Sequence, residues 1–524
     1  MFSPDQKPVF GEKTKKLREI FEGNNSNNWL TSNELRKCLH ILDIYPAESQ
    51  VVEYVHDACQ ISGRLEKKIS FGEFCYIVSV LEDEYRKCSA DRKSPNATPP
   101  KCRQCGDFIF LGGSCNPTTW RGDTVIPFLM KHNLTFYNPQ RDDWSEELVQ
   151  QETEAKDRAE VLFFVIDNVT RSTASMVESA NLAAKGKPLI LIIKRFDGPH
   201  KEVAGEKLSE IEYEDLCRSH AYLTHLVERR GIPVFSDIDV ALECLRRVLH
   251  EDIPLEELTL KDGAIPVKHP HVRISDKFRQ IKEAFDKHGA DYLNRDEINE
   301  AFKYLTSADL PKWVWHSSGP DKKFNLEEFY CLVTEFKNER QLSVASILRG
   351  IVRFPIVIYD WLIGRSQSCP ELIRTKSVQD YDIFLGGTCA DSLWREEIAI
   401  PILDKAGLTY YNPKKQEWTT RYIAREASVK DHCKALLYVI TSQTRGITSM
   451  LEAAYYSGLG RKVIFCILSI NTKKISGEEL TENAIKDYNR ARTYLFEITQ
   501  ECPHFQNIED AVREAVRIVQ EQSY

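Results

Sequence analysis

The sequence lacks any uncharged apolar stretch of the roughly 18 residues that a membrane-spanning helix requires. Its most apolar segment, Ile347 to Gly364, is interrupted by charged residues and a proline, which favours a docking or interfacial segment. The opening residues, MFSPDQKPVFGEKTKK, lack the apolar centre of a secretory signal peptide. We therefore expect no spanning helix. The apolar segment is the candidate for peripheral membrane contact, which we do not expect.

Long basic runs are also missing, and the 524 residues carry a formal net charge of −8. This argues against a nucleic-acid partner, because phosphate backbones bind clustered Lys and Arg. Fifteen cysteines without a secretory signal fit reduced thiols, so we predict a cytoplasmic location. Cys102 and Cys105 form one CxxC pair, but no second ligand pair for zinc is evident. The sequence therefore predicts no metal site and no cofactor.

An internal duplication is the strongest signal in the chain. FIFLGGSCN at 108–116 matches DIFLGGTCA at 382–390, and LTFYNPQRDDW at 134–144 matches LTYYNPKKQEW at 408–418. TRSTASMVESA at 170–180 matches TRGITSMLEAA at 444–454. All three pairs share one offset of 274 residues, as from 108 to 382, with no insertion between them. One fold therefore occurs twice.

Each repeat alternates strand-length apolar runs with segments of helical spacing. This pattern predicts an α/β fold, with a doubly wound, flavodoxin-like parallel sheet in each repeat. Such sheets bind ligands beyond the C-terminal ends of their strands. The expected strands are 108–113, 134–138, 161–167, 188–193 and 233–236 in the first repeat, and 382–387, 408–412, 435–441, 462–468 and a weaker run near 503–506 in the second.

A helical stretch precedes each α/β region and resembles a degenerate pair of EF-hands. In each of its loops an apolar residue is followed four positions later by Glu: Leu30/Glu34, Ile69/Glu73, Leu293/Glu297 and Phe324/Glu328. The early loop positions lack the carboxylates that calcium requires, so we expect a helical scaffold without calcium. The predicted domains are 1–95 (helical), 96–265 (α/β), 266–345 (helical) and 346–524 (α/β).

Two carboxylates recur in both α/β repeats with the same spacing. Glu152 precedes Glu178 by 26 residues, as Glu426 precedes Glu452. An ionised carboxylate at the sheet edge could attack the anomeric carbon of a sugar, and a second carboxyl could protonate the departing base. The alternative is that these side chains are solvated or form ion pairs. We predict that the two carboxylates of each pair lie close together in one cleft.

The motifs IFLGGS, Trp-Arg, YNP, Gln-Glu and Ser-Met-x-Glu together resemble the nucleoside 2-deoxyribosyltransferase-like superfamily. The resemblance implies that Glu178 and Glu452 are nucleophiles that form a glycosyl-enzyme intermediate. It implies that Glu152 and Glu426 assist the leaving base.

Three positions depart from the pattern of the classical enzymes of this superfamily. Phe110 and Phe384 replace a strand-one Tyr that hydrogen-bonds the nucleophile. Ser172 and Gly446 replace an Asp six residues before it. The leaving-group acid is Glu where Asp is usual. Losing an orienting hydroxyl and a carboxylate lowers the rate, so catalysis is less expected than ligand binding.

The arginines after the strand ends favour a phosphate-bearing ligand, since Arg binds anions bidentately. The alternative is that they pair with nearby acids. Aromatic side chains at the same edges, Trp120, Tyr137, Trp394 and Tyr411, could stack a base or simply form the wall. The predicted ligand-binding residues are Gly112, Gly113, Arg121, Asn138 and Arg171 in the first repeat, and Gly386, Gly387, Arg395, Asn412 and Arg445 in the second.

The arrangement of helical regions and doubled α/β domains also resembles the animal Raw family of developmental regulators. This resemblance implies an intracellular regulatory protein, acting in signalling, development or neuronal differentiation, with protein partners in its pathway. Its clefts would bind a nucleoside or nucleotide with little turnover. The alternative is an active N-glycosidase or deoxyribosyltransferase that cleaves a nucleoside or nucleotide through a Glu nucleophile.

Overall fold

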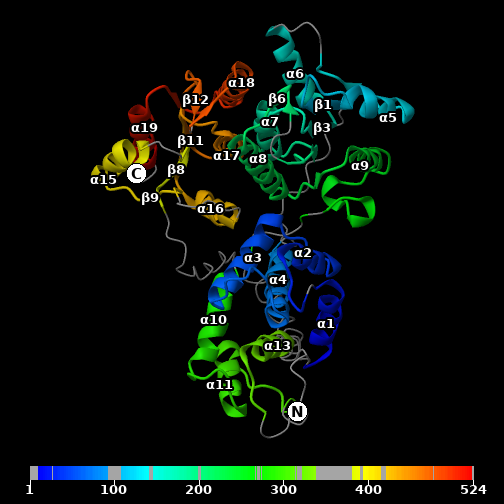
Figure 1. Cartoon of the computed structure of the whole chain (residues 1–524), viewed down its shortest axis with the longest axis vertical. Helices are drawn as coiled ribbons and strands as arrows, with labels where there is room; N and C mark the ends of the chain where they lie inside the picture. The colour runs from blue at the N-terminus through cyan, green and yellow to red at the C-terminus, as the bar shows by residue number, and fades with distance from the viewer. Residues whose placement is uncertain are drawn as a thin grey trace, which may run out of the picture. The chain divides into compact units, whose positions relative to one another are not determined.

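The structure, a computed structural model, divides into two compact units, Met1–Ala97 with His269–Ser377 and Thr98–Lys268 with Val378–Tyr524 (Figure 1). The apolar segment 347–364 and the CxxC pair lie outside the described residues. The structure describes residues 10–25, 27–91, 108–140, 146–198, 202–265, 267, 272, 274–312, 314, 322–337, 381–389, 393–414, 421–475 and 477–521.

The first unit is helical and draws on both halves of the chain. Its loops are joined in pairs by short antiparallel bridges, Leu30 with Ile69 and Leu293 with Phe324. Two backbone hydrogen bonds of 2.8 and 2.9 Å close each bridge. The bridging residues are the four apolar loop residues of the sequence pattern. The helices are α1 (Glu12–Asn24), α2 (Ser32–Ile41), α3 (Glu48–Ile61), α4 (Phe71–Asp91), α10 (Ser275–Asp286), α11 (Arg295–Thr306) and α13 (Leu326–Phe336).

The glutamates of these loops stabilise the first turns of the helices that follow them. Glu34 accepts the backbone N–H of Thr31 at 2.7 Å, and Glu297 accepts that of Asn294 at 2.8 Å. Such reciprocal capping satisfies N–H groups that a helix start leaves without partners. Among the described residues, no group of three or more His, Cys, Asp or Glu side chains is arranged to hold a metal ion. The relation to EF-hands and the absence of calcium binding stay predictions.

The second unit contains two five-stranded sheets in which every pairing is parallel. The strand orders, β2-β1-β3-β4-β7 and β9-β8-β10-β11-β14, are equivalent and confirm the doubly wound fold predicted for each repeat. The strands are β1 (Ile109–Gly113), β2 (Phe136–Tyr137), β3 (Val161–Ile166), β4 (Leu189–Ile193), β7 (Val234–Phe235), β8 (Ile383–Gly387), β9 (Tyr410–Tyr411), β10 (Ala435–Ile440), β11 (Val463–Ile467) and β14 (His504–Phe505).

The second unit also contains the helices that flank these sheets and two short hairpins. In the first domain they are η1 (Arg121–Val125), α5 (Ile126–Lys131), α6 (Glu146–Arg158), α7 (Thr173–Ala184), β5 (Glu202–Val203), β6 (Glu206–Lys207), α8 (Glu210–Glu228), α9 (Ile238–His250), η2 (Leu255–Glu257) and η3 (Leu260–Asp262). In the second they are η4 (Arg395–Ala399), α15 (Ile400–Lys405), α16 (Arg421–His432), α17 (Ile447–Gly458), β12 (Lys474–Ile475), β13 (Glu478–Glu479), α18 (Glu482–Ile498) and α19 (Ile508–Glu521).

Close packing within each sheet explains the Gly-Gly pair that ends the first strand. A Cβ on Gly112 would lie 2.3 Å from the ring of Phe164, and one on Gly113 would lie 2.2 Å from the carbonyl oxygen of Val165. Gly113 also has a φ of +103°, which only glycine adopts readily. The second repeat has the same constraint, because a Cβ on Gly387 would lie 2.1 Å from the carbonyl oxygen of Val439. The fold itself therefore requires the Gly-Gly pair at the end of the first strand in each repeat.

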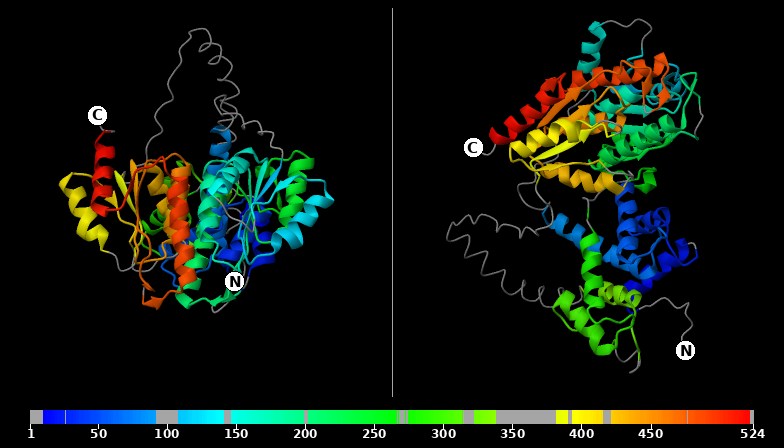
Figure 2. Two further views of the ribbon diagram at one scale, coloured as in Figure 1. Left: turned by 90° about the horizontal axis from the view of Figure 1, so that it is seen from above. Right: turned by 60° about the vertical axis from the view of Figure 1, so that its left-hand side comes forward.

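The two α/β domains of this unit share one hydrophobic core. Helices α7 and α8 of the first domain pack against α17 and α18 of the second, so that the two sheets lie on opposite sides of a central helical layer (Figure 2). The amide of Asn181 on α7 donates to the carbonyl of Ala454 on α17 at 2.9 Å. Among the described helices, none has the length and apolar character needed to cross a membrane.

Substitution of Gly458 should test this shared core. A Cβ at Gly458 would lie 2.8 Å from both the Cβ of Ala184 and the carbonyl oxygen of Asn181. We expect Gly458→Ala to lower the free energy of unfolding by about 1–3 kcal/mol, as overpacking does. Gly122→Ala is the matched control, because nothing lies within 4 Å of its Cβ position. Urea unfolding of both variants measures the difference, and equal stability would contradict a shared core.

Glu327 predicts a pH dependence of the helical unit. Burial and the neighbouring Glu73 raise its pKa from 4.5 to about 7, although the N–H of Gly72 donates to it at 2.7 Å. The folded state therefore holds a proton that the unfolded state releases, and stability should fall as the pH rises from about 4.5 to about 7. Glu327→Gln should remove this fall and stabilise the protein at pH 8 by about 2 kcal/mol. Thermal melts across this pH range, with the exposed Glu300→Gln as control, would contradict the prediction if both variants kept the wild-type slope.

Candidate functional site

A cavity of about 430 Å³ opens at the C-terminal edge of the second sheet. One side is built from the ends of β8 and β9, the loop after β10 and the start of α17, where a doubly wound sheet binds its ligands. The other side is the α8 helix of the first domain, which contributes Asp215, Arg218, Ser219 and Tyr222. The second domain's cavity is therefore completed by the first domain.

The structure brings Glu426 and Glu452 together at this cavity, with a lysine between them. Lys430 is fully buried, lies 3.5 Å from a carboxylate oxygen of Glu426, and makes a short ion pair with Glu452. Its ammonium group also lies 4.6 Å from the ring centre of Phe384. A buried ammonium between two carboxylates offsets their mutual repulsion. We call Glu426, Lys430, Glu452 and the cavity the second site.

The first domain repeats this arrangement in more exposed form. Lys156 lies 2.6 Å from Glu178 and 3.7 Å from Glu152, so the lysine brings the two carboxylates together. The side chain of Glu152 is 31% exposed. Burial and the charge of Glu178 raise the pKa of Glu152, while the charges of Lys156 and Arg490 oppose this rise. We call Glu152, Lys156 and Glu178 the first site.

A tyrosine from the opposite domain donates a hydrogen bond to each predicted nucleophile. Tyr222 on α8 donates to Glu452, and Tyr494 on α18 donates to Glu178. Burial and then the adjacent carboxylate raise the pKa of both phenols, so both remain donors at neutral pH. Phe110 and Phe384 have no hydroxyl, so in each domain a tyrosine hydroxyl reaches the carboxylate from the opposite domain instead.

Sequence reasoning missed these tyrosines, although a signal was present. Residues 205–210, GEKLSE, match 477–482, GEELTE, and AYL at 221–223 matches TYL at 493–495. The offset of these segments is 272 rather than 274, because the connection before them is two residues shorter in the second repeat. Following the repeat through this deletion pairs Tyr222 with Tyr494. It does not show that each acts in the other domain.

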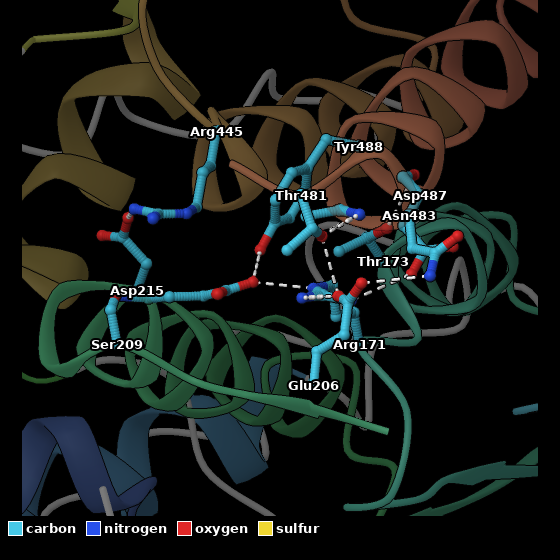
Figure 3. Close-up of polar contacts among 12 residues, drawn as sticks. Arg171, Thr173, Glu206, Ser209, Asp215, Arg445, Thr481, Asn483, Asp487 and Tyr488 are labelled. Atoms are coloured by element: carbon cyan, nitrogen blue, oxygen red, sulfur yellow. Dashed lines mark hydrogen bonds and ion pairs between the residues drawn. The ribbon is translucent and has the colours of Figure 1, made fainter. Parts of the chain in front are cut away.

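Arg171 and Arg445 lie at the domain interface in a network of ion pairs (Figure 3). Arg171 is 1% exposed and donates to Glu212 at 2.7 Å and to Glu206 at 2.8 Å. It also lies 3.6 Å from Asp487 of the second domain. Tyr488 of the second domain donates to the same Glu212 at 2.5 Å. The guanidinium group of Arg171 therefore joins the two domains.

Arg445 makes the reciprocal contacts in the second domain. It donates to Asp215 of the first domain at 3.0 Å and to Glu478 of its own domain at 2.5 Å. Arg445 is only 3% exposed, and it lines the cavity with its guanidinium group paired to these acids. Acids thus occupy the anion-binding faces of both interface arginines.

Arg121 and Arg395 bind the backbone at the end of the first strand of their domains. The guanidinium group of Arg121 donates to the carbonyls of Leu111 at 3.1 Å and Ser114 at 2.6 Å, and it stacks on Trp120. Arg395 donates to the carbonyl of Thr388 at 2.7 Å in the same way. Each arginine opens a π-helical turn and is almost fully buried. Phosphate contact by the four arginines stays a prediction, and these internal partners argue against it.

The remaining predicted residues lie at the same sheet edges. Gly386 and Gly387 line the cavity. The amide oxygens of Asn138 and Asn412 accept the N–H two residues ahead, at 3.1 and 3.0 Å, and so fix the turn after the second strand. Tyr411 stacks on Phe384 with ring centres 5.6 Å apart, which makes it part of the wall beneath the site.

Comparison with known proteins agrees with this geometry. A family model described as "Nucleoside 2-deoxyribosyltransferase like" matches residues 107–196 and 380–470. A search of curated proteins and a search of solved structures gave no match. The matched ranges contain β1 to β4 and β8 to β11, together with all four predicted carboxylates. The chain therefore carries two copies of a nucleoside 2-deoxyribosyltransferase-like domain.

Proposed function

We propose that this chain is a regulatory protein whose two deoxyribosyltransferase-like sites bind a nucleoside or nucleotide with little or no turnover. The observation that carries this proposal is the lysine held between the two carboxylates of each site. Both carboxylate pairs, both lysines and both tyrosines recur in the two domains.

The lysine opposes the chemistry that a retaining transferase needs. That chemistry requires one carboxylate free to attack the sugar and one carboxyl group that still holds a proton for the base. Lys430 contacts both Glu426 and Glu452, so each carboxylate already has a cation as its partner. Lys430 and Tyr222 also bind the same oxygen of Glu452. Both carboxylates of the resting site therefore have partners already, which favours binding of a ligand over attack by Glu452 on its sugar.

The shape of the second site fits a ligand of nucleoside size. Small-molecule sites typically have volumes of about 300–1,000 Å³, and this cavity of about 430 Å³ lies in that range. Its lining combines Phe384 and Ile447 with carboxylates and hydroxyls, as recognition of a flat base and a polar sugar requires. Fold alone does not assign function, so ligand type rests on these side chains.

The regulatory part of the proposal rests on the arrangement of the chain. A reaction of this class needs one competent site, whereas this chain fuses two sites and a helical unit into one polypeptide. Ligand occupancy at the domain interface could then be read by a protein partner in a signalling pathway. A role in development or neuronal differentiation, as in the Raw family, is the finer form of this proposal.

A second candidate function, N-glycosidase activity, is favoured by one observation at the first site. Glu152 is more exposed than Glu426, and burial together with Glu178 raises its pKa. A carboxyl group with a raised pKa can hold the proton that a departing base requires.

Release of free base from nucleosides should separate the two functions. We expect the wild-type chain to bind deoxynucleosides or their 5′-monophosphates in calorimetry. Base release, followed by chromatography, should be no faster than in the Glu178→Gln, Glu452→Gln double variant, which keeps the shape of both sites but neutralises the predicted nucleophile in each. Base release that exceeds this control by about a hundredfold, a typical effect of positioned acid–base groups, would establish the glycosidase instead.

Removal of each lysine should reveal how strongly it holds its carboxylates. Lys430→Met leaves two buried carboxylates without a cation and should lower the free energy of unfolding at pH 8 by about 3 kcal/mol. Lys156→Met should cost about 1 kcal/mol, because water screens the first site. Repulsion raises the folded pKa of the remaining pair, so both losses should shrink at pH 5. Urea unfolding at the two pH values is the measurement, and equal losses in the two variants would refute the proposed role of burial.

A further inference from the structure

The two sites share their chemistry but differ in the helix that each receives from the opposite domain. The α8 helix faces the second site, where Tyr222 reaches Glu452 and Asp215 pairs with Arg445 at 3.0 Å. The α18 helix faces the first site, where Tyr494 reaches Glu178 and Asp487 lies 3.6 Å from Arg171. Tyr222 therefore corresponds to Tyr494, and Asp215 corresponds to Asp487. Both pairs are 272 residues apart, so the two helices align residue by residue with this offset.

This register identifies the charged positions of each facing helix. Positions 214 and 218 on α8 lie on the same face as Asp215 and Tyr222, because residues three or four apart share a helix face. Both Glu214 and Arg218 line the cavity of the second site. Their equivalents on α18 are Lys486 and Arg490. The charge of Arg490 acts on both Glu152 and Asp487, which places it beside the first site.

One position therefore reverses its charge between the two sites. The second site has Glu214 where the first has Lys486, a difference of two charges. Arg218 is paired with Asp215 at 3.4 Å. Lys486 and Arg490 are exposed and, within the part of the chain that the structure describes, have no ion-pair partner. The helix that faces the first site thus carries two exposed cations at these positions, whereas the helix that faces the second site carries Glu214 and an arginine paired with Asp215.

We infer that the two sites select different ligands: the first takes a nucleoside 5′-monophosphate through Lys486 and Arg490, and the second takes the unphosphorylated nucleoside. A phosphate monoester carries a charge of about −1.5 to −2 at neutral pH. At the first site, such a phosphate gains charge-assisted hydrogen bonds from Lys486 and Arg490. At the second site, Glu214 repels it. This inference rests on the proposed nucleoside binding and adds a division of labour between the duplicated domains.

Calorimetric titration of the full chain with the four common deoxynucleosides and their 5′-monophosphates tests this inference. For the preferred base, we expect one monophosphate site per chain, with affinity about tenfold above that of the nucleoside at low ionic strength. Lys486→Glu should remove this tenfold preference for the monophosphate. Glu214→Lys should create a second monophosphate site, so that the stoichiometry rises from one to two.

Lys462→Glu is the matched control, because it makes the same charge change at an exposed residue. Lys462 precedes β11, at the edge of the second sheet opposite to the C-terminal strand ends. Thermal melts establish that the variants are folded. Unchanged monophosphate affinity in Lys486→Glu, or equal affinity of inorganic phosphate and the monophosphate, would overturn the inference while nucleoside binding stands. Failure of every nucleoside and monophosphate to bind the wild-type chain would instead remove the proposed function and this inference with it.

Discussion

The hydrogen bond from a tyrosine of one domain to a carboxylate of the other is the interaction on which both sites depend. Tyr222 and Tyr494 lie on the long helices that form the shared core of the second unit. An isolated domain would lose the orienting hydroxyl, one wall of its site and the apolar surface that its neighbour covers. Duplication within one chain therefore supplies what two associating copies would otherwise supply, and it allows the two halves to diverge.

The ionic network beside these tyrosines shows how that divergence is limited. Arg171 and Arg445 each pair with an acid on the opposite domain and an acid on their own. Removing an acid from one of these pairs is costly, because it leaves the buried guanidinium group of the arginine without that partner. The paired arginines and acids of the interface recur in both repeats, whereas the exposed positions 214 on α8 and 486 on α18 differ in charge. In the division of labour that we propose, ligand selectivity is set at positions 214 and 486, which lie outside this ionic network.

Sequence reasoning predicted the strands and the convergence of the carboxylates because both leave local signals. Buried parallel strands read as apolar runs, and the 26-residue spacing of Glu152 and Glu178 survives in both repeats. The lysine at 156 and 430 was equally visible at the common offset, but its partners depend on folded distances. The tyrosines and the acids that pair with Arg171 could not be assigned, since they come from the opposite domain. No local pattern records which surface of a repeat meets the other.

The central claim is that a nucleoside-type ligand binds against a carboxylate that stays paired with its lysine. A crystal structure of the full chain with a bound deoxynucleoside tests it most directly. We predict an intact glycosidic bond, with the sugar against Glu452 and the ion pair between Lys430 and Glu452 retained. A free base, or a sugar bonded covalently to Glu452, would contradict this account and identify an active transferase.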